Sequence, residues 1–170
     1  AIATAKRMGA VVYATDVRYA TKEQVESLGG KFIVVDEEKM KAAQTAGGYA
    51  KEMSAEYRAK QADLVSSHIA KQDIVITTAQ VPGRRPPLLV TKDAVAKMKS
   101  GSVIVDMAAS ALGGNCELTK PGETITTPNG VTIIGPENLP ASMPASASAF
   151  YARNISALLL GMVKDGNLHL

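Results

Sequence analysis

The stretch Val11-Val12-Tyr13-Ala14-Thr15-Asp16-Val17-Arg18 decides how the rest of the sequence is interpreted. Its β-branched and aromatic residues predict a buried strand over 10–15, which places Asp16 at the carboxyl end of that strand. In dinucleotide-binding folds, an acid at this place hydrogen-bonds the ribose hydroxyls on the adenine side. The alternative, that Asp16 is an ordinary turn residue at a strand end, stays equally open on this stretch alone.

The residues before this strand predict the end of a helix. Lys6 and Arg7 suit the last helical turn, and Gly9 suits its stop. The strand-end acid normally follows a Gly-x-Gly-x-x-Gly turn by about 20 residues, and no such turn precedes Asp16. We therefore expect a fragment from which the first strand and the glycine loop are missing.

Composition narrows the function classes. The 170 residues suffice for one α/β domain, and the net charge of +3 is spread along segments in which basic and acidic residues alternate. No basic stripe with aromatic residues occurs, so we expect no nucleic-acid binding. The single cysteine, Cys116, fits a loop thiol in a reducing compartment. The longest mostly apolar run, 157–163, is too short to span a bilayer, and no metal-binding spacing of His, Cys or Asp is present.

The rest of the chain predicts alternating helices and strands. A strand–helix–strand order at this spacing favours a right-handed parallel crossover, and hence an α/β, doubly wound, mostly parallel sheet. The expected strands are 31–35, 73–78 and 102–106, with a hairpin of 123–127 and 131–135 around Asn129-Gly130. The expected helices begin after caps at Thr21, Ser54 and Thr91, and a last helix begins after Ser146 or Ser148.

Two segments carry further candidates for a site. The segment 36–53 lacks periodicity and contains Gly47-Gly48-Tyr49, which suits a mobile loop with an aromatic tip; a solvated insertion is the other interpretation. In the helix after Ser54, Gln61 is the better candidate for a ligand contact, and His68 is expected to be a partly buried histidine.

Strand ends carry Asp16, Thr78 and Asp106, and no nucleophile–base pair or phosphate loop can be assembled from the sequence. This set suits the holding of a dinucleotide better than acid–base catalysis. Hydride transfer asks little of the protein beyond alignment and exclusion of water, because the cofactor carries the chemistry. We therefore expect cofactor-binding residues and no catalytic side chain.

Five stretches together resemble a known family: 14–18, 22–29, 48–53, 76–79 and 113–115. They are similar to the NAD(H)-binding domain of proton-translocating nicotinamide nucleotide transhydrogenase, whose soluble relative is alanine dehydrogenase. The stretch Gly48-Tyr49-Ala50-Lys51-Glu52-Met53, which resembles the mobile loop of the family, is the most specific part. The resemblance implies a Rossmann-like fold, with an incomplete NAD(H)-binding domain over 1–145 and a C-terminal helix over 146–170 that packs on a neighbouring domain absent from this chain.

The resemblance also implies roles for particular residues. At the adenosine end it places Asp16, Val17 and Arg18. The loop that closes over the cofactor contains Gly48 and Tyr49. The residues toward the nicotinamide are Gln61, Thr78, Ala79 and Gln80. Gln80, Ser110 and Ser142 depart from the family pattern, which bears on the nicotinamide side and the docking surface.

For the whole enzyme, the resemblance implies hydride transfer from NAD(H) on this domain to NADP(+) on another domain, coupled to proton translocation by a membrane domain. It further implies a homodimer at the cytoplasmic face of a bacterial inner membrane or on the matrix side of a mitochondrial one. A chain that began at Ala1 is expected to be inactive alone. The alternatives are a fragment of a soluble alanine dehydrogenase-like amino-acid oxidoreductase and a non-catalytic nucleotide-binding module.

Overall fold

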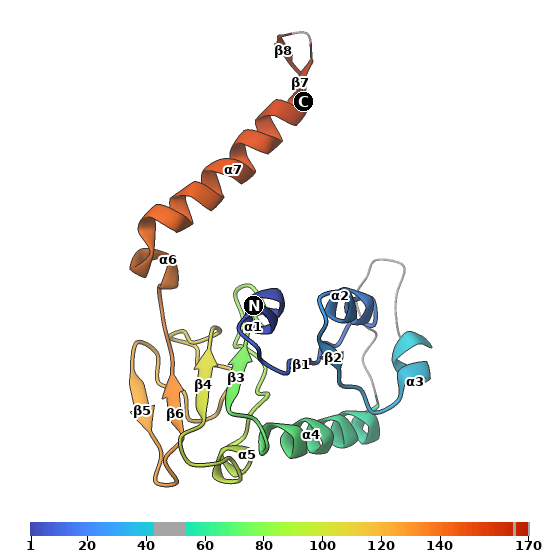
Figure 1. Cartoon of the computed structure of the whole chain (residues 1–170), viewed down its shortest axis with the longest axis vertical. Helices are drawn as coiled ribbons and strands as arrows, with labels where there is room; N and C mark the ends of the chain where they lie inside the picture. Colours follow the sequence, from blue (N-terminus) through green and yellow to red (C-terminus); the bar gives the residue numbers. More distant parts are fainter. Residues whose placement is uncertain (43–53, 165, 170) are drawn as a thin grey trace.

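Strands from the first 35 residues and strands from the later part of the chain form separate sheets in the computed structural model, which describes residues 1–42, 54–164 and 166–169 (Figure 1). The strands are β1 (Tyr13–Ala14), β2 (Lys31–Phe32), β3 (Ile74–Thr77), β4 (Val103–Asp106), β5 (Thr124–Thr126), β6 (Thr132–Ile134), β7 (Val163–Lys164) and β8 (Asn167–Leu168). The helices are α1 (Ile2–Arg7), α2 (Thr21–Ser27), α3 (Glu37–Ala42), α4 (Ala55–Ile69), α5 (Lys92–Ala96), α6 (Leu139–Ser142) and α7 (Pro144–Met162).

The larger sheet has the strand order β3-β4-β6-β5. Its first three strands are parallel, and β5 pairs antiparallel with β6 across the predicted hairpin. Gly130 has a φ of +82° in that turn, a conformation that glycine adopts without strain. The prediction of a mostly parallel sheet with an Asn-Gly hairpin is confirmed.

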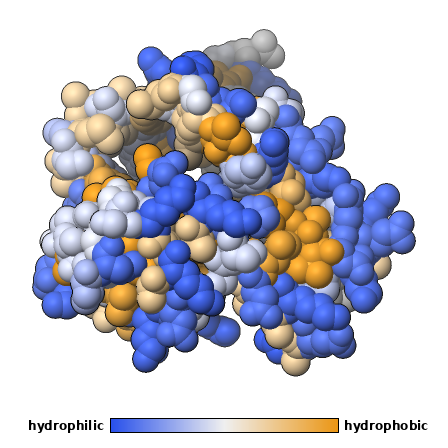
Figure 2. All heavy atoms as spheres, turned by 60° about the horizontal axis from the view of Figure 1, so that its bottom comes forward, coloured by the Kyte–Doolittle hydropathy of each residue, from blue (hydrophilic) through white to orange (hydrophobic). Residues whose placement is uncertain are grey.

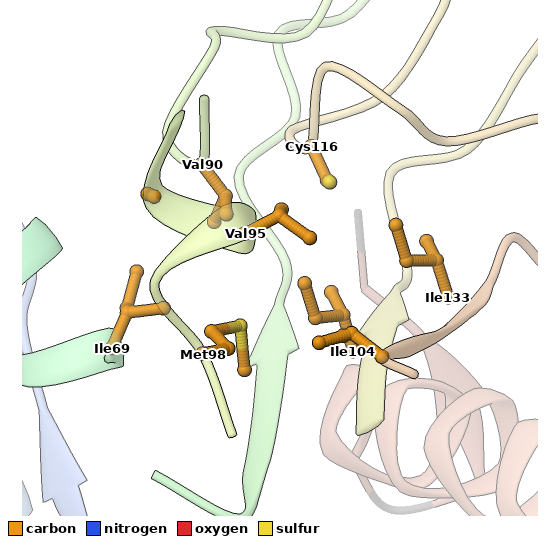
Figure 3. Close-up of a cluster of buried hydrophobic side chains, with 9 residues drawn as sticks. Ile69, Val90, Val95, Met98, Ile104, Cys116 and Ile133 are labelled. Atoms are coloured by element: carbon orange, nitrogen blue, oxygen red, sulfur yellow. The ribbon is translucent and has the colours of Figure 1, made fainter. Parts of the chain in front are cut away.

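The core lies between this sheet and the helices α4 and α5 (Figure 3). Ile104 of β4 and Ile133 of β6 are almost completely buried against Val95 of α5. Ile69 at the end of α4 reaches the same cluster. Each fully buried aliphatic side chain contributes about 1.5–3 kcal/mol of transfer free energy, so this cluster dominates the stability of the larger sheet.

The smaller sheet pairs β1 with β2 in parallel, as the strand–helix–strand pattern predicts. The prediction of a buried strand over 10–15 is wrong in length and in burial, because only Tyr13 and Ala14 form a strand and the Val11 side chain is 66% exposed. Lys31 and Ile33 donate from β2 and its continuation to the carbonyls of Val12 and Ala14. The backbone groups of Tyr13 therefore face the other edge of β1, and that edge pairs with no described strand.

Of the helix caps predicted at Thr21, Ser54 and Thr91, the last two are confirmed and the first is wrong. The hydroxyl oxygens of Ser54 and Thr91 each accept a hydrogen bond from the backbone N–H three residues on, both at 3.2 Å. Thr21 instead lies inside the first turn of α2, and its hydroxyl donates to the carbonyl of Arg18 at 2.7 Å. A threonine can bond a preceding carbonyl in this way, and that bond replaces the expected cap.

The segment 36–53, expected to be an irregular loop, begins with the helix α3. The Asp36 carboxylate accepts from the backbone N–H of Lys39 at 3.0 Å, which is the bond that starts this helix. The rest of the expected loop, with Gly48 and Tyr49, lies outside the described residues.

The helix α7 extends away from the sheets (Figure 1) and buries none of its residues. It begins at Pro144, earlier than the predicted caps at Ser146 or Ser148, because proline suits the first helical turn. Leu160 is 74% exposed and Phe150 64%. No described helix is long and apolar enough to cross a membrane. Apolar patches also interrupt the mainly hydrophilic face seen in Figure 2.

Candidate functional site

Asp16, the second residue after β1, is held by Arg18 through three hydrogen bonds. The Arg18 backbone N–H and Nε donate to Oδ1 at 2.9 and 3.0 Å, and Nη2 donates to Oδ2 at 2.9 Å. Partial burial opposes ionisation of this carboxyl, but the bonds and the charge of Arg18 outweigh burial and hold the pKa of Asp16 below its ordinary value. The side chain is therefore ionised and fixed in orientation at neutral pH.

The same carboxylate remains able to bind a ligand hydroxyl. Its side chain is 29% exposed. Arg18 donates to both of its oxygens, and a backbone hydrogen bond from Val17 also favours its charged form, so the exposed part of the side chain is what a ligand hydroxyl can reach. Val17, between the two charged residues, is 75% exposed and offers an apolar surface beside them. This arrangement suits a hydroxyl-bearing ring that lies against an apolar side chain.

Gln61 of α4 connects the ends of the two strands of the smaller sheet. Its Oε1 accepts from the backbone N–H of Val35 at 3.2 Å, and its Nε2 donates to the hydroxyl of Thr15 at 3.1 Å. Both ends of the amide thus bind protein groups, and one of them belongs to Thr15, the residue before Asp16. A direct ligand contact by Gln61 stays a prediction. The neighbouring His68 is partly buried and lies edge-on to the Tyr13 ring at 5.6 Å, as expected for a histidine with a local partner.

The predicted residues after β3 lie in a loop that is tied to the end of β4. Thr78 is exposed, and the Gln80 side chain donates to the carbonyl of Met107 at 3.2 Å. Ala79, which the resemblance places toward the nicotinamide, uses both of its backbone groups within the protein. Its N–H donates to Asn115 Oδ1 at 3.0 Å, and its carbonyl accepts from Asn115 Nδ2 at 2.9 Å.

Asp106, at the end of β4, is completely buried and bound by four donors. The donors are the hydroxyls of Thr77 and Thr119, at 3.0 and 2.7 Å, and the backbone N–H groups of Ala108 and Cys116, at 3.1 and 2.9 Å. A carboxylate with this many internal partners organises the loop around it and does not face a ligand. Asp106 is therefore fully bound within the protein, whereas the Asp16 side chain is partly exposed.

Asn115 is a residue that the sequence did not single out as part of the site. Its signal is the glycine pair that precedes it, because a Cβ on Gly114 would lie 2.2 Å from Asp106 Oδ2. Only glycine lets the backbone pass so close to the buried carboxylate, and that approach carries Asn115 under Ala79. Cys116, the next residue, is buried, and burial raises the pKa of its thiol, so it is no ready nucleophile.

The described residues contain no group of three or more His, Cys, Asp or Glu side chains that could hold a metal ion. Their polar groups lie instead at the carboxyl ends of parallel strands, Asp16 in the smaller sheet and Thr78 in the larger one. In open parallel sheets this is where ligands bind. The arrangement can hold a polar ligand with hydroxyl groups, and it presents no acid–base pair.

The family model described as "Alanine dehydrogenase/PNT, C-terminal domain" matches residues 1–170. The chain belongs to this family. It is 60% identical over 155 residues to the first part of NAD(P) transhydrogenase subunit alpha of Rhodospirillum rubrum, a match that covers 91% of this chain and 40% of that protein. The crystal structure of transhydrogenase from Sinorhizobium meliloti gives a TM-score of 0.76 at 49% identity, covering 98% of this chain and 42% of the other.

A more distant similarity connects the chain to an amino-acid dehydrogenase. "Alanine dehydrogenase 1" of Staphylococcus aureus is 37% identical over 100 residues, which is 56% of this chain and 26% of that protein. The resemblance to the transhydrogenase family and the Rossmann-like fold are therefore both confirmed. The chain spans about two fifths of the length of the Rhodospirillum relative, at 40%.

Proposed function

We propose that this chain binds NAD(H) and presents the nicotinamide for hydride transfer to NADP(+) bound on another domain. The adenosine end lies at Asp16, Val17 and Arg18, and the nicotinamide end lies at Thr78, Ala79 and Gln80. The observation that carries the proposal is the Asp16 carboxylate, which Arg18 keeps ionised and oriented at the end of β1. Similarity to transhydrogenase subunits supports the choice of reaction.

The two cofactors are distinguished at the adenine-side ribose. A carboxylate accepts a hydrogen bond from the 2′-hydroxyl of NAD(H) and repels the 2′-phosphate of NADP(H). Arg18 does not compensate for that repulsion while it is bound to Asp16 on both oxygens. We therefore expect this domain to prefer NAD(H).

A titration of the full-length protein with NADH and NADPH tests the binding half of the proposal. We expect Asp16→Asn to weaken NADH binding about tenfold, which corresponds to about 1.4 kcal/mol. The matched control is Asp36→Asn, because Asp36 follows β2 as Asp16 follows β1 but caps α3. Equal or tighter binding of NADPH by the NAD(H) domain, or equal losses in the two variants, would overturn the assignment.

The whole enzyme, in this proposal, also contains an NADP(H)-binding domain and a membrane domain that translocates protons, and it forms a homodimer. It lies at the cytoplasmic face of a bacterial inner membrane or on the matrix side of a mitochondrial one. The test is direct transfer of deuterium from C4-labelled NADH to NADP(+) in membranes that contain the protein. Label lost to water instead of transferred to NADP(+) would contradict a direct step.

Similarity to alanine dehydrogenase supports a second candidate, the oxidation of an amino acid with NAD(+). An alanine dehydrogenase would use the same adenosine site, so cofactor binding does not distinguish the two candidate functions. An assay of NAD(+) reduction with L-alanine as the hydride donor distinguishes them. Turnover with L-alanine and none with NADP(+) would favour this candidate over transhydrogenation.

A further inference from the structure

Asn115 is bound on every polar atom of its side chain and is completely buried. Beyond its two bonds to Ala79, its Nδ2 donates to the carbonyl of Pro87 at 2.8 Å. Its backbone carbonyl accepts from Leu89 and Val90 at 2.8 and 3.0 Å. One residue therefore holds both ends of the loop that leaves β3.

The hydrogen bonds between Asn115 and Ala79 replace the next hydrogen bonds that β3 and β4 would form with each other. Met107 donates to the carbonyl of Thr77 at 2.8 Å, and there the ladder between β3 and β4 ends. Alternate residues of a parallel strand bond the same neighbour, so Ala79 is the next residue whose backbone faces β4. Asn115 supplies the acceptor and the donor for it.

This bonding fixes the residue between the two anchors. Thr77, the residue before Thr78, is hydrogen-bonded to Met107 at the end of β4. Ala79, the residue after it, is hydrogen-bonded to Asn115. The amide itself cannot shift, because the next backbone N–H, that of Cys116, is bound to the buried Asp106 at 2.9 Å. Gln80 is held from the same direction through the carbonyl of Met107.

We propose that Asn115 is a positioning residue for the nicotinamide end of the site, where its buried amide clamps the Ala79 peptide and so sets the places of Thr78 and Gln80. The inference rests on the proposed binding of NAD(H). It adds a residue that touches no cofactor but determines how accurately the cofactor is aligned. Misplacement by about 1 Å can cost 100-fold in rate, so alignment is the property at stake.

The test compares Asn115→Ala with Asn129→Ala in the full-length protein. Asn129 is the matched control, because its amide also donates to backbone carbonyls, those of Val95, Ala96 and Met98, at 3.1–3.4 Å. Asn129 lies in the β5–β6 turn, next to the start of β4. Asn115 lies at the opposite end of β4, where the strand finishes. Both variants should lower the thermal unfolding midpoint by similar amounts.

The two variants should differ in ligand binding and in rate. We expect Asn115→Ala to weaken NADH binding about tenfold, to slow hydride transfer at saturating NADH about tenfold or more, and to leave the affinity for AMP within about twofold. Asn129→Ala should change none of the three. AMP is the probe of the adenosine end alone, so a loss confined to NADH places the defect at the nicotinamide end.

Three outcomes separate the inference from the proposed function. Unchanged NADH affinity and rate in Asn115→Ala, with a lowered unfolding midpoint, would show a merely structural asparagine. Failure of the unmodified protein to bind NADH would overturn the proposed function, and the inference with it. If Asn115→Ala does not fold, hydrogen exchange of the unmodified protein decides, because the Ala79 amide must be protected without NADH, and fast exchange there would overturn the clamp.

Discussion

The larger sheet, β3-β4-β6-β5, and the smaller sheet, β1-β2, differ in how many neighbours their strands have. In the larger sheet, Ile104 lies between β3 and β6 and under α5, and it is completely buried. In the smaller sheet, Tyr13 has one neighbouring strand and is 38% exposed. Within the larger sheet, valine and isoleucine dominate β3 as well as β4, yet in β3, at the edge of that sheet, Ile74 is 65% exposed and Ile76 51%. The burial of a strand thus depends on how many neighbours it has, which side-chain composition does not reveal.

The sheets also differ in how they hold polar groups at their strand ends. The larger sheet buries Asp106 and Asn115, and the structure satisfies each of them with internal partners. Next to the smaller sheet the charges form partly exposed pairs, Asp16 with Arg18 after β1, and Lys22 of α2 with Glu37 of α3. Buried networks are costly to break, whereas exposed pairs contribute little. We therefore expect substitutions at the larger sheet to cost far more stability.

Asp106→Ala should have the largest effect on stability. Removal of the carboxylate leaves four buried donors without their acceptor, so we expect a loss of about 4 kcal/mol in the free energy of unfolding. Urea unfolding of the full-length protein measures it. Asp73→Ala is the control, because the Asp73 side chain is 89% exposed and should change stability by less than about 0.5 kcal/mol. Similar losses of stability in both variants would contradict the difference expected between buried and exposed carboxylates.

Gly114→Ala should follow, with a loss of about 2 kcal/mol. The added methyl group meets Asp106 Oδ2 at 2.2 Å and the Thr119 Cβ at 3.1 Å, so the buried network must shift. The matched control is Gly161→Ala in α7, where nothing lies within 4 Å of the new Cβ. Alanine is the better helix former, so that variant should gain up to about 1 kcal/mol. Thermal unfolding gives both signs, and a loss in both would refute the crowding argument.

The sequence predicted well what depends on neighbours in the chain. The caps at Ser54 and Thr91 and the Asn129-Gly130 turn are local, and all three are confirmed. The expectation that His68 of α4 is partly buried is confirmed as well. The carboxyl ends of the strands are local features as well, which is why the candidate site could be placed at Asp16 and Thr78.

The sequence failed where partners lie far apart in the chain. The partner of Asn115 is Ala79, 36 residues earlier, and no local pattern connects the two. The exposure of β1 likewise follows from a missing neighbour among the described strands. Each of these outcomes depends on tertiary structure that propensity does not encode.

Gln61→Ala tests the smaller sheet, with an expected loss of about 1 kcal/mol. The amide holds the N–H of Val35 and the hydroxyl of Thr15 in a partly buried place, so both lose a partner. Without ligand, hydrogen exchange should accelerate over β1 and β2 and stay unchanged over β4. Gln24→Ala on the exposed side of α2 is the control and should change neither. Acceleration in both sheets would show that they unfold as one unit.

Arg18→Ala should have the smallest effect on stability and a clear effect on titration. In the unmodified protein the pKa of Asp16 is lowered, so this carboxylate stabilises the fold above its ordinary pKa of about 3.9, and the contribution is lost as the pH falls through the lower folded value. In Arg18→Ala the side-chain hydrogen bonds and the charge of Arg18 are lost, whereas the backbone N–H groups of residues 17 and 18 still favour the charged form, so the pKa of Asp16 rises toward its ordinary value and its contribution to stability shrinks. Because the pair is partly exposed, we expect a change of only about 0.5 kcal/mol at neutral pH. NMR titration of the Asp16 carboxyl measures the shift directly, with Arg153→Ala on α7 as the control that leaves it unchanged. A pKa of Asp16 that stays low in Arg18→Ala would mean that backbone groups hold the carboxylate without help from the guanidinium.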